Sequence, residues 1–412
     1  MKATTRYLEK QKFSSRISSL PHERLKVIVV IPCKAEPELD KTLHSLQLAA
    51  RGIETMIEII IVLNDHDQDK DEIVQQNVKT KTWLCAASFL IPVQIIHLTH
   101  IPHKRAGVGH ARKTGMDEAI HRFIQANQPE GIICSMDADT IVSENYFREL
   151  VRAFEYLKKD CILIHFEHVL DGLNMQHRKA VVLYELHLRY YIEALRWAGF
   201  PHAYQTLGSA IAVTASGYVA QGGMPPRQAG EDFYFVQKFA KLDRVAELNT
   251  TIVFPSARVS DRVPFGTGKA IGDMIKNDRE WGSTYPFRAF MDLKMFLHSL
   301  DKLYTSQWQN TSLPESVFTF LNEIKFDIIR KELISNTSDY KHFIKRFFQK
   351  MDAFMMMKYI HYARDHFYGS DDVIASALEL ADLKFNYKKR SADLEELLGE
   401  YRAWQKKSNP VK

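Results

Sequence analysis

Two carboxylates separated by one residue, Asp137 and Asp139, follow directly after the apolar stretch 131–136. Carboxylates at this spacing at the end of a strand can share one hard divalent cation, either directly or through water. Such a cation can in turn hold a diphosphate group. The chain contains three further Asp-x-Asp pairs, all between Asp65 and Asp71, so the pattern alone is weak. The preceding strand is what makes Asp137 and Asp139 a candidate metal site.

The acidic run from Asp65 to Asp71 does not fit a calcium-binding loop. Counting from Asp65, the sixth position is Lys70 where glycine is required, and the twelfth is Gln76 where glutamate is required. We therefore expect most of this run to form a solvated turn and a helix start, where acidic residues are favourable. Asn64 and Asp65 differ, because they end an apolar strand and could hydrogen-bond the edge of a nucleobase.

Two glycines and four cations gather at the start of a predicted helix, in the segment 104–113. Backbone amides at a helix start, together with arginine and lysine side chains, suit an anionic phosphate. Gly107 and Arg112 are the candidates in this segment. The spacing matches neither the phosphate loop of nucleotide hydrolases nor the dinucleotide-binding glycine pattern. An ordinary basic loop explains the segment equally well.

The adjacent carboxylates Glu231 and Asp232 follow a glycine pair at 222–223. A carboxylate at the start of a helix could act as a general base if its surroundings adjust its pKa. The simpler interpretation is a helix start with acidic residues in its first turn. The segment 258–269, which includes Arg262 and Lys269, either closes over phosphates or is a basic surface loop.

Strands alternate with helices through the first half of the chain. Short apolar runs predict buried strands at 26–32, 57–63, 93–98, 131–136 and 161–165, and periodic patterns predict helices at 39–48, 70–87, 109–126, from 146 onward and at 176–198. This alternation predicts an α/β fold, with a mainly parallel sheet covered by helices on both faces. Ligands in such sheets bind beyond the carboxyl ends of the strands, where the polar clusters lie.

The composition divides the chain into three parts. We expect a polar N-terminal extension at 1–23, an α/β domain at 24–285 and a helical C-terminal region at 286–412. The segment 199–226 is apolar and glycine-rich, which suggests a loop-rich pocket lining. In the tail, seven apolar side chains between 343 and 355 share one helical face. We favour a core-facing helix, with contact to a membrane or a lipid-linked substrate as the alternative.

Charge and cysteine content limit the partners and the compartment. The net charge is +5, which suits an anionic substrate but is too small to indicate nucleic-acid binding. The four cysteines contain no Cys-x-x-Cys pair, so we expect neither disulfides nor a thiolate zinc site. The start of the chain has no apolar signal segment, and the best membrane candidate, 82–102, is interrupted by polar residues. We therefore expect a cytoplasmic protein, with association with the inner face of the membrane left open.

The order of these features along residues 25–270 resembles the family 2 glycosyltransferases of the GT-A fold. The features that carry the resemblance are Pro32 to Glu36 after the first strand, Asn64-Asp65 after the second, Gly107 to Lys113 at the helix start, Asp137 and Asp139, and Glu231-Asp232. The chain has Leu63-Asn64 where the family has Asp-Asp, and Lys113 where the family has asparagine.

The resemblance implies a role for each of these segments. Pro32, Glu36, Asn64 and Asp65 would hold the nucleoside of a nucleoside-diphosphate sugar. Asp139, helped by Asp137, would bind Mg²⁺ or Mn²⁺. Gly107, Arg112 and Asp137 would face the donor and its phosphates, and Arg262 and Lys269 of the basic segment 258–269 are further candidates for donor contact.

The implied reaction is an inverting, hexosyltransferase-like single displacement. Asp232, next to Glu231, would take the proton from an acceptor hydroxyl as that oxygen attacks the sugar. The metal ion would stabilise charge on the leaving diphosphate. The acceptor could be a glycan, a lipid-linked molecule or a small molecule. Two alternatives stay open: a non-catalytic protein that binds sugar nucleotides or glycans through a relic site, and a nucleotidyltransferase. The segment after the first strand lacks the glycine-rich phosphate loop that the second alternative usually has.

Overall fold

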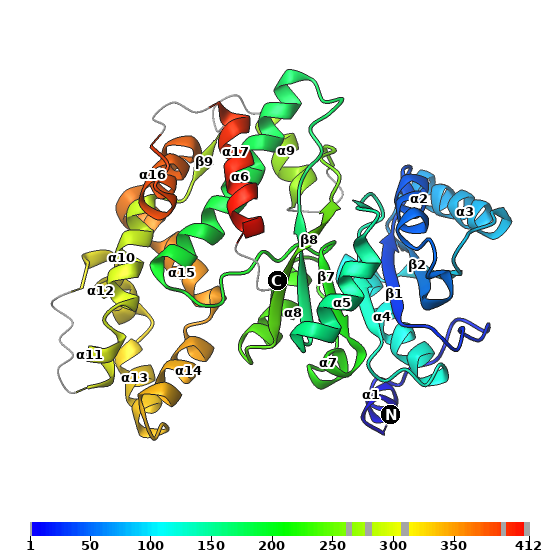
Figure 1. The fold of residues 1–412 in the computed structure, drawn as a ribbon, viewed down its shortest axis with the longest axis horizontal. Helices are drawn as coiled ribbons and strands as arrows, with labels where there is room; N and C mark the ends of the chain where they lie inside the picture. Colours follow the sequence, from blue (N-terminus) through cyan, green and yellow to red (C-terminus); the bar gives the residue numbers. More distant parts are fainter. Residues whose placement is uncertain (1, 261–265, 277–281, 306–312, 389–392, 408–412) are drawn as a thin grey trace. The chain divides into compact units, whose positions relative to one another are not determined.

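A computed structural model describes residues 2–260, 266–276, 282–305, 313–388 and 393–407 (Figure 1). Arg262 lies outside these ranges. The chain divides into two compact units. Unit 1 comprises Met1–Val169, Thr206–Lys269 and Gln405–Lys412, and unit 2 comprises Leu170–Gln205 and Ala270–Trp404. Each unit therefore combines segments that are distant in the sequence, and the predicted boundary at 285 remains a prediction.

Unit 1 is built on an eight-stranded sheet with the order β3-β2-β1-β4-β7-β6-β8-β5. Its strands are β1 Val27–Cys33, β2 Ile57–His66, β3 Val93–Ile101, β4 Ile132–Ser135, β5 Ile141–Val142, β6 Cys161–Phe166, β7 Ile211–Thr214 and β8 Val245–Phe254. β3, β2, β1 and β4 pair in parallel, as do β6 and β8. β7 is antiparallel to both of its neighbours, and β5 is antiparallel to β8. The predicted mainly parallel α/β sheet is confirmed.

Helices cover both faces of the parallel part of this sheet. Val29 of β1 belongs to the core that includes α2 (Leu39–Ala49) and α5 (Tyr146–Leu157). Val30, the next residue, points to the opposite face, where it meets Gly115 of α4 (Val108–Gln125). A side chain at Gly115 would come within 2.4 Å of Val30, so the glycine lets α4 pack closely on the sheet. β1 and β2 are buried on both faces, which explains their continuous apolar runs.

Two segments of unit 1 differ from the sequence-based expectations. The stretch 199–226 contains β7 and α7 (Ala215–Ala220), and β7 is completely buried in the middle of the sheet. The four residues of β7 are too few to show the alternating pattern of a strand. The strand forms because it pairs with β4 and β6. The polar N-terminal segment forms α1 (Lys2–Lys10), whose Tyr7 hydroxyl donates a 2.8 Å hydrogen bond to Asp117 of α4.

The remaining helices of unit 1 border the predicted site. They are α3 Asp71–Ala86 and α8 Glu231–Ala240. Two further helices, α9 Thr267–Lys276 and α17 Leu394–Lys407, cross the boundary between the units along the chain. Pro32 fits inside β1 because it lies beyond Val30, where the pairing of β1 with β4 ends.

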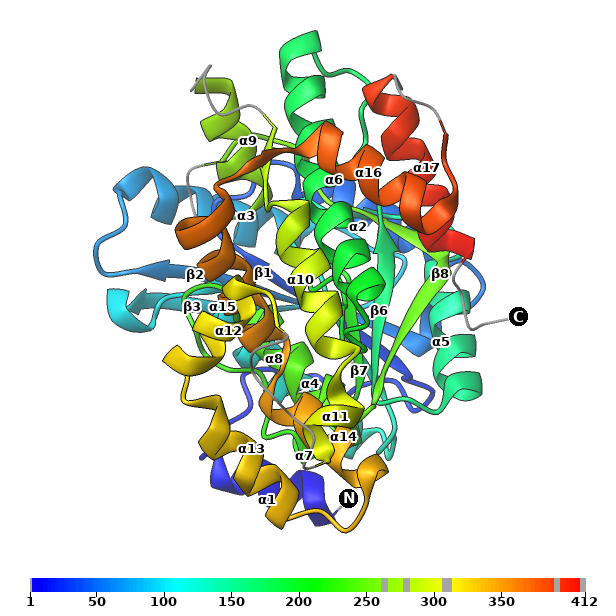
Figure 2. The ribbon, with the colours of Figure 1, turned by 90° about the vertical axis from the view of Figure 1, so that its left-hand side faces the viewer.

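Unit 2 is mainly helical, as expected for the C-terminal part. Its other elements are α6 Met175–Ala198, β9 Ser283–Thr284, α10 Phe287–Leu297, α11 Leu300–Tyr304, α12 Glu315–Glu323, α13 Phe326–Ser335, α14 Tyr340–Lys350, α15 Ala353–Ala363, β10 Asp371–Asp372 and α16 Val373–Phe385. α6 packs beside α10 and α16 (Figure 2). Phe343 and Phe347 of α14 are fully buried in the core of unit 2, but the expected single helical face is divided, because Phe354 and Met355 lie half-buried in the next helix, α15. Within the described residues, no helix combines the length and hydropathy needed to cross a membrane.

Candidate functional site

The candidate site lies in unit 1, at the carboxyl ends of β1, β2 and β4. Because these strands are parallel neighbours, the segments that follow them meet at one edge of the sheet. The turn that carries Asp137 and Asp139 is held by backbone and side-chain contacts on two sides. Met136 N donates to Val30 O at 3.1 Å, and the buried Thr42 hydroxyl of α2 donates to Ala138 O at 2.9 Å. The two aspartates are thus presented by a fixed turn.

Arg112 of α4 joins Asp137 to Glu231, and we call these three residues the Arg112 cluster. Its guanidinium donates one hydrogen bond to Asp137 and another to Glu231. Arg112 and Glu231 are only 3% and 2% exposed, so this ion pair is largely out of water. Gly208 lies against the guanidinium, where a Cβ atom would approach Arg112 Nη1 to 2.4 Å. The absence of a side chain at Gly208 therefore makes room for the cluster.

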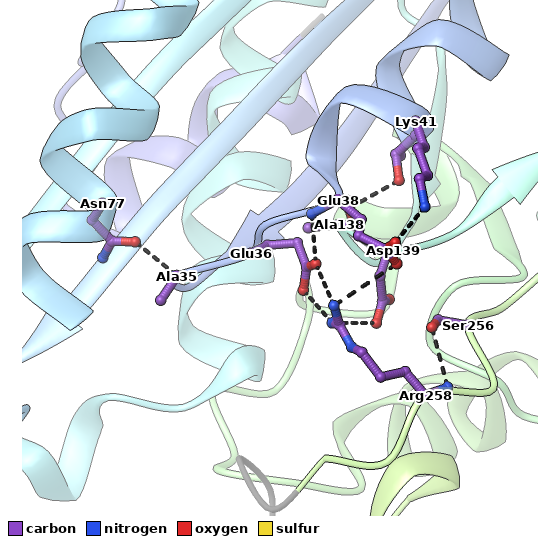
Figure 3. A network of polar contacts seen from close by, with 10 residues as sticks. Ala35, Glu36, Glu38, Lys41, Asn77, Ala138, Asp139, Ser256 and Arg258 are labelled. Carbon is purple, nitrogen blue, oxygen red and sulfur yellow. Dashed lines mark hydrogen bonds and ion pairs between the residues drawn. The ribbon is translucent and has the colours of Figure 1, made fainter. Parts of the chain in front are cut away.

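Arg258 binds the other aspartate, and we call Arg258, Glu36 and Asp139 the Arg258 cluster (Figure 3). Its two terminal nitrogens lie 2.9 and 2.6 Å from the two carboxylate oxygens of Glu36. One of these nitrogens is also 3.2 Å from Asp139 Oδ2. The side chain of Arg258 is 29% exposed, whereas that of Glu36 is 3% exposed. The cluster joins the loop after β1 to the Asp137–Asp139 turn.

Asp232 follows Glu231 in the first turn of α8. Its Oδ1 accepts a 2.8 Å hydrogen bond from Phe233 N. Burial raises the pKa of the Asp232 carboxyl, which Arg112 and the Phe233 amide partly offset. Burial likewise raises the pKa of the Glu231 carboxyl against the opposing effect of Arg112. α8 begins after Gly230, whose φ of +70° suits glycine. Asp232 is therefore a half-buried carboxylate beside the Arg112 cluster.

Asn64 and Asp65 are engaged in contacts with other loops. Asn77 of α3 donates to Asn64 O at 3.0 Å and accepts from Ala35 N at 2.8 Å, so it ties the end of β2 to the loop after β1. Asp65 is fully buried and accepts a 2.9 Å hydrogen bond from His100 N. The role of Asn64 and Asp65 in holding a nucleoside remains a prediction.

The acidic run after Asp65 is less solvated than its sequence suggests. Asp67 accepts a 3.0 Å hydrogen bond from His103 N. Asp69, whose side chain is 4% exposed, lies 2.6 Å from Lys34 Nζ and accepts a hydrogen bond from His66 N. These carboxylates fix the loops around the end of β2, so the expected solvated turn is wrong for Asp69.

Gly107 and Lys269 were predicted to contact phosphate, and both lie at the start of a helix. A Cβ atom at Gly107 would come within 2.4 Å of Gln228 Cα, so this glycine lets α4 begin against the backbone of residues 225–228. Lys269 lies in the first turn of α9. A phosphate contact of either residue stays a prediction. Arg258 begins the basic segment 258–269 but was not predicted as a site residue, because nothing in the sequence distinguishes it from the other cations of that segment.

The carboxylate oxygens at this edge of the sheet are suitable ligands for a hard divalent metal ion. Within the described ranges, no three His, Cys, Asp or Glu side chains converge as a group that could hold a metal ion. Mg²⁺ is, however, commonly held by one or two carboxylates together with substrate phosphates. Asp137 and Asp139 provide two such carboxylates, whose side chains are 41% and 25% exposed. The residues present therefore fit a metal ion that arrives with a phosphorylated ligand.

The comparison with protein families bears on this edge of the sheet. The family model described as Glycosyl transferase family 2 matches residues 28–211, which include Glu36, Arg112, Asp137 and Asp139. The match covers under half of the chain, so it shows what this segment is similar to. Glu231, Asp232 and Arg258 lie beyond this segment. No curated protein sequence matches the chain.

Several solved structures are distantly similar to this chain. Residues 1–349 of S. aureus TarS in complex with UDP-GlcNAc align with 14% identity and a TM-score of 0.40, covering 89% of this chain and 93% of that one. The mannosyltransferase PcManGT from Pyrobaculum calidifontis, in complex with GDP-Man and Mn²⁺, aligns with 12% identity and a TM-score of 0.37, covering 97% and 89%. The longer TarS chain aligns over 54% of its length and 74% of this chain, with a TM-score of 0.39 and 14% identity. At these TM-scores the similarity assigns neither donor nor acceptor.

Proposed function

We propose that the chain transfers a sugar from a nucleoside-diphosphate donor to an acceptor hydroxyl, with inversion at the anomeric carbon. The observation that carries this proposal is the placement of Asp137 and Asp139 on a fixed turn, with the half-buried carboxylate of Asp232 close to Asp137 and Arg112. A metal-diphosphate site and a nearby base are the two parts that such a displacement needs.

Each residue of the site has a distinct task in this proposal. Asp232 accepts the proton of the acceptor hydroxyl while the acceptor oxygen bonds to the anomeric carbon. The bond from that carbon to the diphosphate breaks, and its electron pair leaves with the diphosphate. Arg112 orients Asp137 and Glu231 and keeps both charges paired. Asp139, with Asp137, would hold Mg²⁺ or Mn²⁺, which when bound would neutralise charge on the leaving group.

The pKa of Asp232 sets the expected pH dependence. The base must be deprotonated, and burial raises the pKa of this carboxyl above its usual range. A general base with a raised pKa is a stronger proton acceptor at neutral pH. Transfer should therefore increase as the pH rises through this raised pKa. The folded state also holds the proton more tightly than the unfolded chain, so this group lowers stability as the pH rises over the same interval.

The variant Asp232→Asn tests the proposal. It should reduce nucleoside-diphosphate release from the donor by roughly 100-fold or more, the lower end of the range for general-base catalysis. The hydrogen bond from Phe233 N can be kept by the asparagine oxygen, so donor affinity should not change. Asp243→Asn is a matched control, because its side chain is 82% exposed.

Thermal shifts of wild type with UDP-, GDP- and other nucleoside-diphosphate sugars, with and without Mn²⁺, identify the donor to use. A donor at about 100 times its Kd should add roughly 2.7 kcal/mol of stability. Asp139→Ala should abolish the metal-dependent part of that shift. If Asp232→Asn transferred the sugar at the wild-type rate, Asp232 would not be the catalytic base. Donor binding without turnover in wild type would instead indicate the non-catalytic binding protein.

A further inference from the structure

The guanidinium of Arg258 lies between Glu36, which the family resemblance places near the nucleoside, and Asp139, which the proposed function gives to the metal ion. It makes a two-point contact with Glu36 and a single contact of 3.2 Å with Asp139 (Figure 3). Glu38 Oε2 lies 3.9 Å from the same guanidinium. Glu38 also pairs with Lys41, so Glu36, Glu38 and Asp139 share the charges of Arg258 and Lys41 at the edge of the sheet.

The backbone around Arg258 is held in place independently of these contacts. Arg258 N donates to the Ser256 hydroxyl at 3.3 Å, and Ser260 N donates to Gly268 O at 3.2 Å. A Cβ atom at Gly268 would approach Arg258 O to 2.9 Å, so the two backbone segments are closely packed. The side chain, in contrast, is partly exposed and has several rotatable bonds. Leaving the carboxylates requires only the side chain to move.

We propose that Arg258 is a built-in counter-ion, which a divalent cation must displace from Asp139 before the metal site forms. This inference rests on the proposed function, because that function assigns the metal ion to Asp139. A divalent ion bound to Asp139 would lie within a few ångströms of the guanidinium. At an effective dielectric constant of about 20, two unit charges about 4 Å apart repel by several kcal/mol, and a divalent ion is repelled more strongly. The two cations therefore exclude one another.

Competition of this kind makes the metal a weak ligand on its own. Arg258 neutralises Asp139 and Glu36 when no ligand is present, so an incoming metal ion must replace an existing ion pair. A donor diphosphate offers negative charge both to the metal ion and to the displaced guanidinium. Metal and donor are then expected to bind together more tightly than either does alone.

Binding of Mn²⁺ alone, followed by the electron paramagnetic resonance signal of the free ion, tests this inference without donor or turnover. Arg258→Gln should bind Mn²⁺ at least about tenfold more tightly than wild type, which corresponds to about 1.4 kcal/mol. Arg258→Lys keeps the positive charge and should remain close to wild type. Arg244→Gln is the matched control, because Arg244 pairs with Asp160 at 2.7 Å on the surface of the same unit. Asp139→Asn should abolish the gain when combined with Arg258→Gln.

Two outcomes would overturn the inference. In the first, Arg258→Gln binds Mn²⁺ no more tightly than wild type. In the second, Arg244→Gln gives the same gain in Mn²⁺ affinity, so that the gain comes from the change in net charge and not from the metal site. The proposed function fails by different results, namely donor binding without turnover or unchanged turnover in Asp232→Asn. A normal loss in Asp232→Asn together with unchanged Mn²⁺ affinity in Arg258→Gln would therefore reject the inference alone.

Discussion

Two arginines each hold one aspartate of the same turn, but their surroundings differ. Arg112 lies almost completely out of water, between Asp137 and Glu231, with Gly208 packed against it. Arg258 is 29% exposed and reaches Asp139 from the segment before α9. The Arg112–Glu231 pair is thus almost completely buried, although Asp137 is 41% exposed, whereas Arg258 and Asp139 of the other cluster are both partly exposed.

The difference separates a contact that maintains the site from one that ligands can replace. Removing one partner of a buried ion pair leaves a charge without compensation, which strongly destabilises a protein. Removing one partner of an accessible pair lets water take its place, and such pairs contribute little. We therefore expect Arg112 to act mainly on stability and Arg258 mainly on ligand affinity.

The largest effect on stability is expected for Arg112→Gln. The change leaves Glu231 and Asp137 without their cation, and breaking a buried pair costs about 3–5 kcal/mol. Without Arg112 the pKa of the Glu231 carboxyl should rise further, so the loss should be greater at about pH 8 than at about pH 5. Urea unfolding at the two pH values measures both effects. A loss of stability below about 1 kcal/mol would mean that the ion pairs of Arg112 contribute no more than exposed ion pairs do.

A smaller loss is expected for Gly208→Ala, which tests the space around Arg112. The new methyl group would overlap the guanidinium, and overpacking typically costs about 1–3 kcal/mol. Gly399→Ala is the control, since nothing lies within 4 Å of its Cβ position and alanine favours the helix α17. Unfolding curves should show the loss for Gly208→Ala only. Equal stability of the two variants would mean that the guanidinium of Arg112 can move away from the new methyl group without cost.

The sequence predicted the elements of unit 1 well where the local pattern was strong. β1 and β2 are buried on both faces, and their apolar runs located both strands to within a few residues. β7 was missed, because four residues carry no usable periodicity and its position depends on pairing with β4 and β6. α1 was missed because its contact with Asp117 is made more than a hundred residues away. Short elements that are stabilised by distant partners have no local signal.

The sequence located the carboxylates of the site better than their partners. Asp137 and Asp139 were singled out because they follow a buried strand, and Glu231 because of its place in the order of the family motifs. Their pairing with Arg112 and Arg258 could not be predicted, since arginines are common and the pairs span 25 to 119 residues. Asn77 was also missed, because an asparagine inside a helix gives no hint that it ties two strand ends together.

The smallest effect on stability is expected for Arg258→Gln, the same change at the other arginine. The Arg258 side chain is 29% exposed and that of Asp139 is 25% exposed, so we expect water to replace the guanidinium at Asp139 and also at Glu36, which is itself 3% exposed. The free energy of unfolding should therefore fall by no more than about 1 kcal/mol in the absence of ligands. Urea unfolding of this variant beside Arg112→Gln gives the comparison directly. A loss as large as that of Arg112→Gln would show that Glu36 needs Arg258 in order to remain buried. The Arg258 cluster would then be a structural tie, and displacement by a metal ion would disrupt the site that the ion is meant to complete.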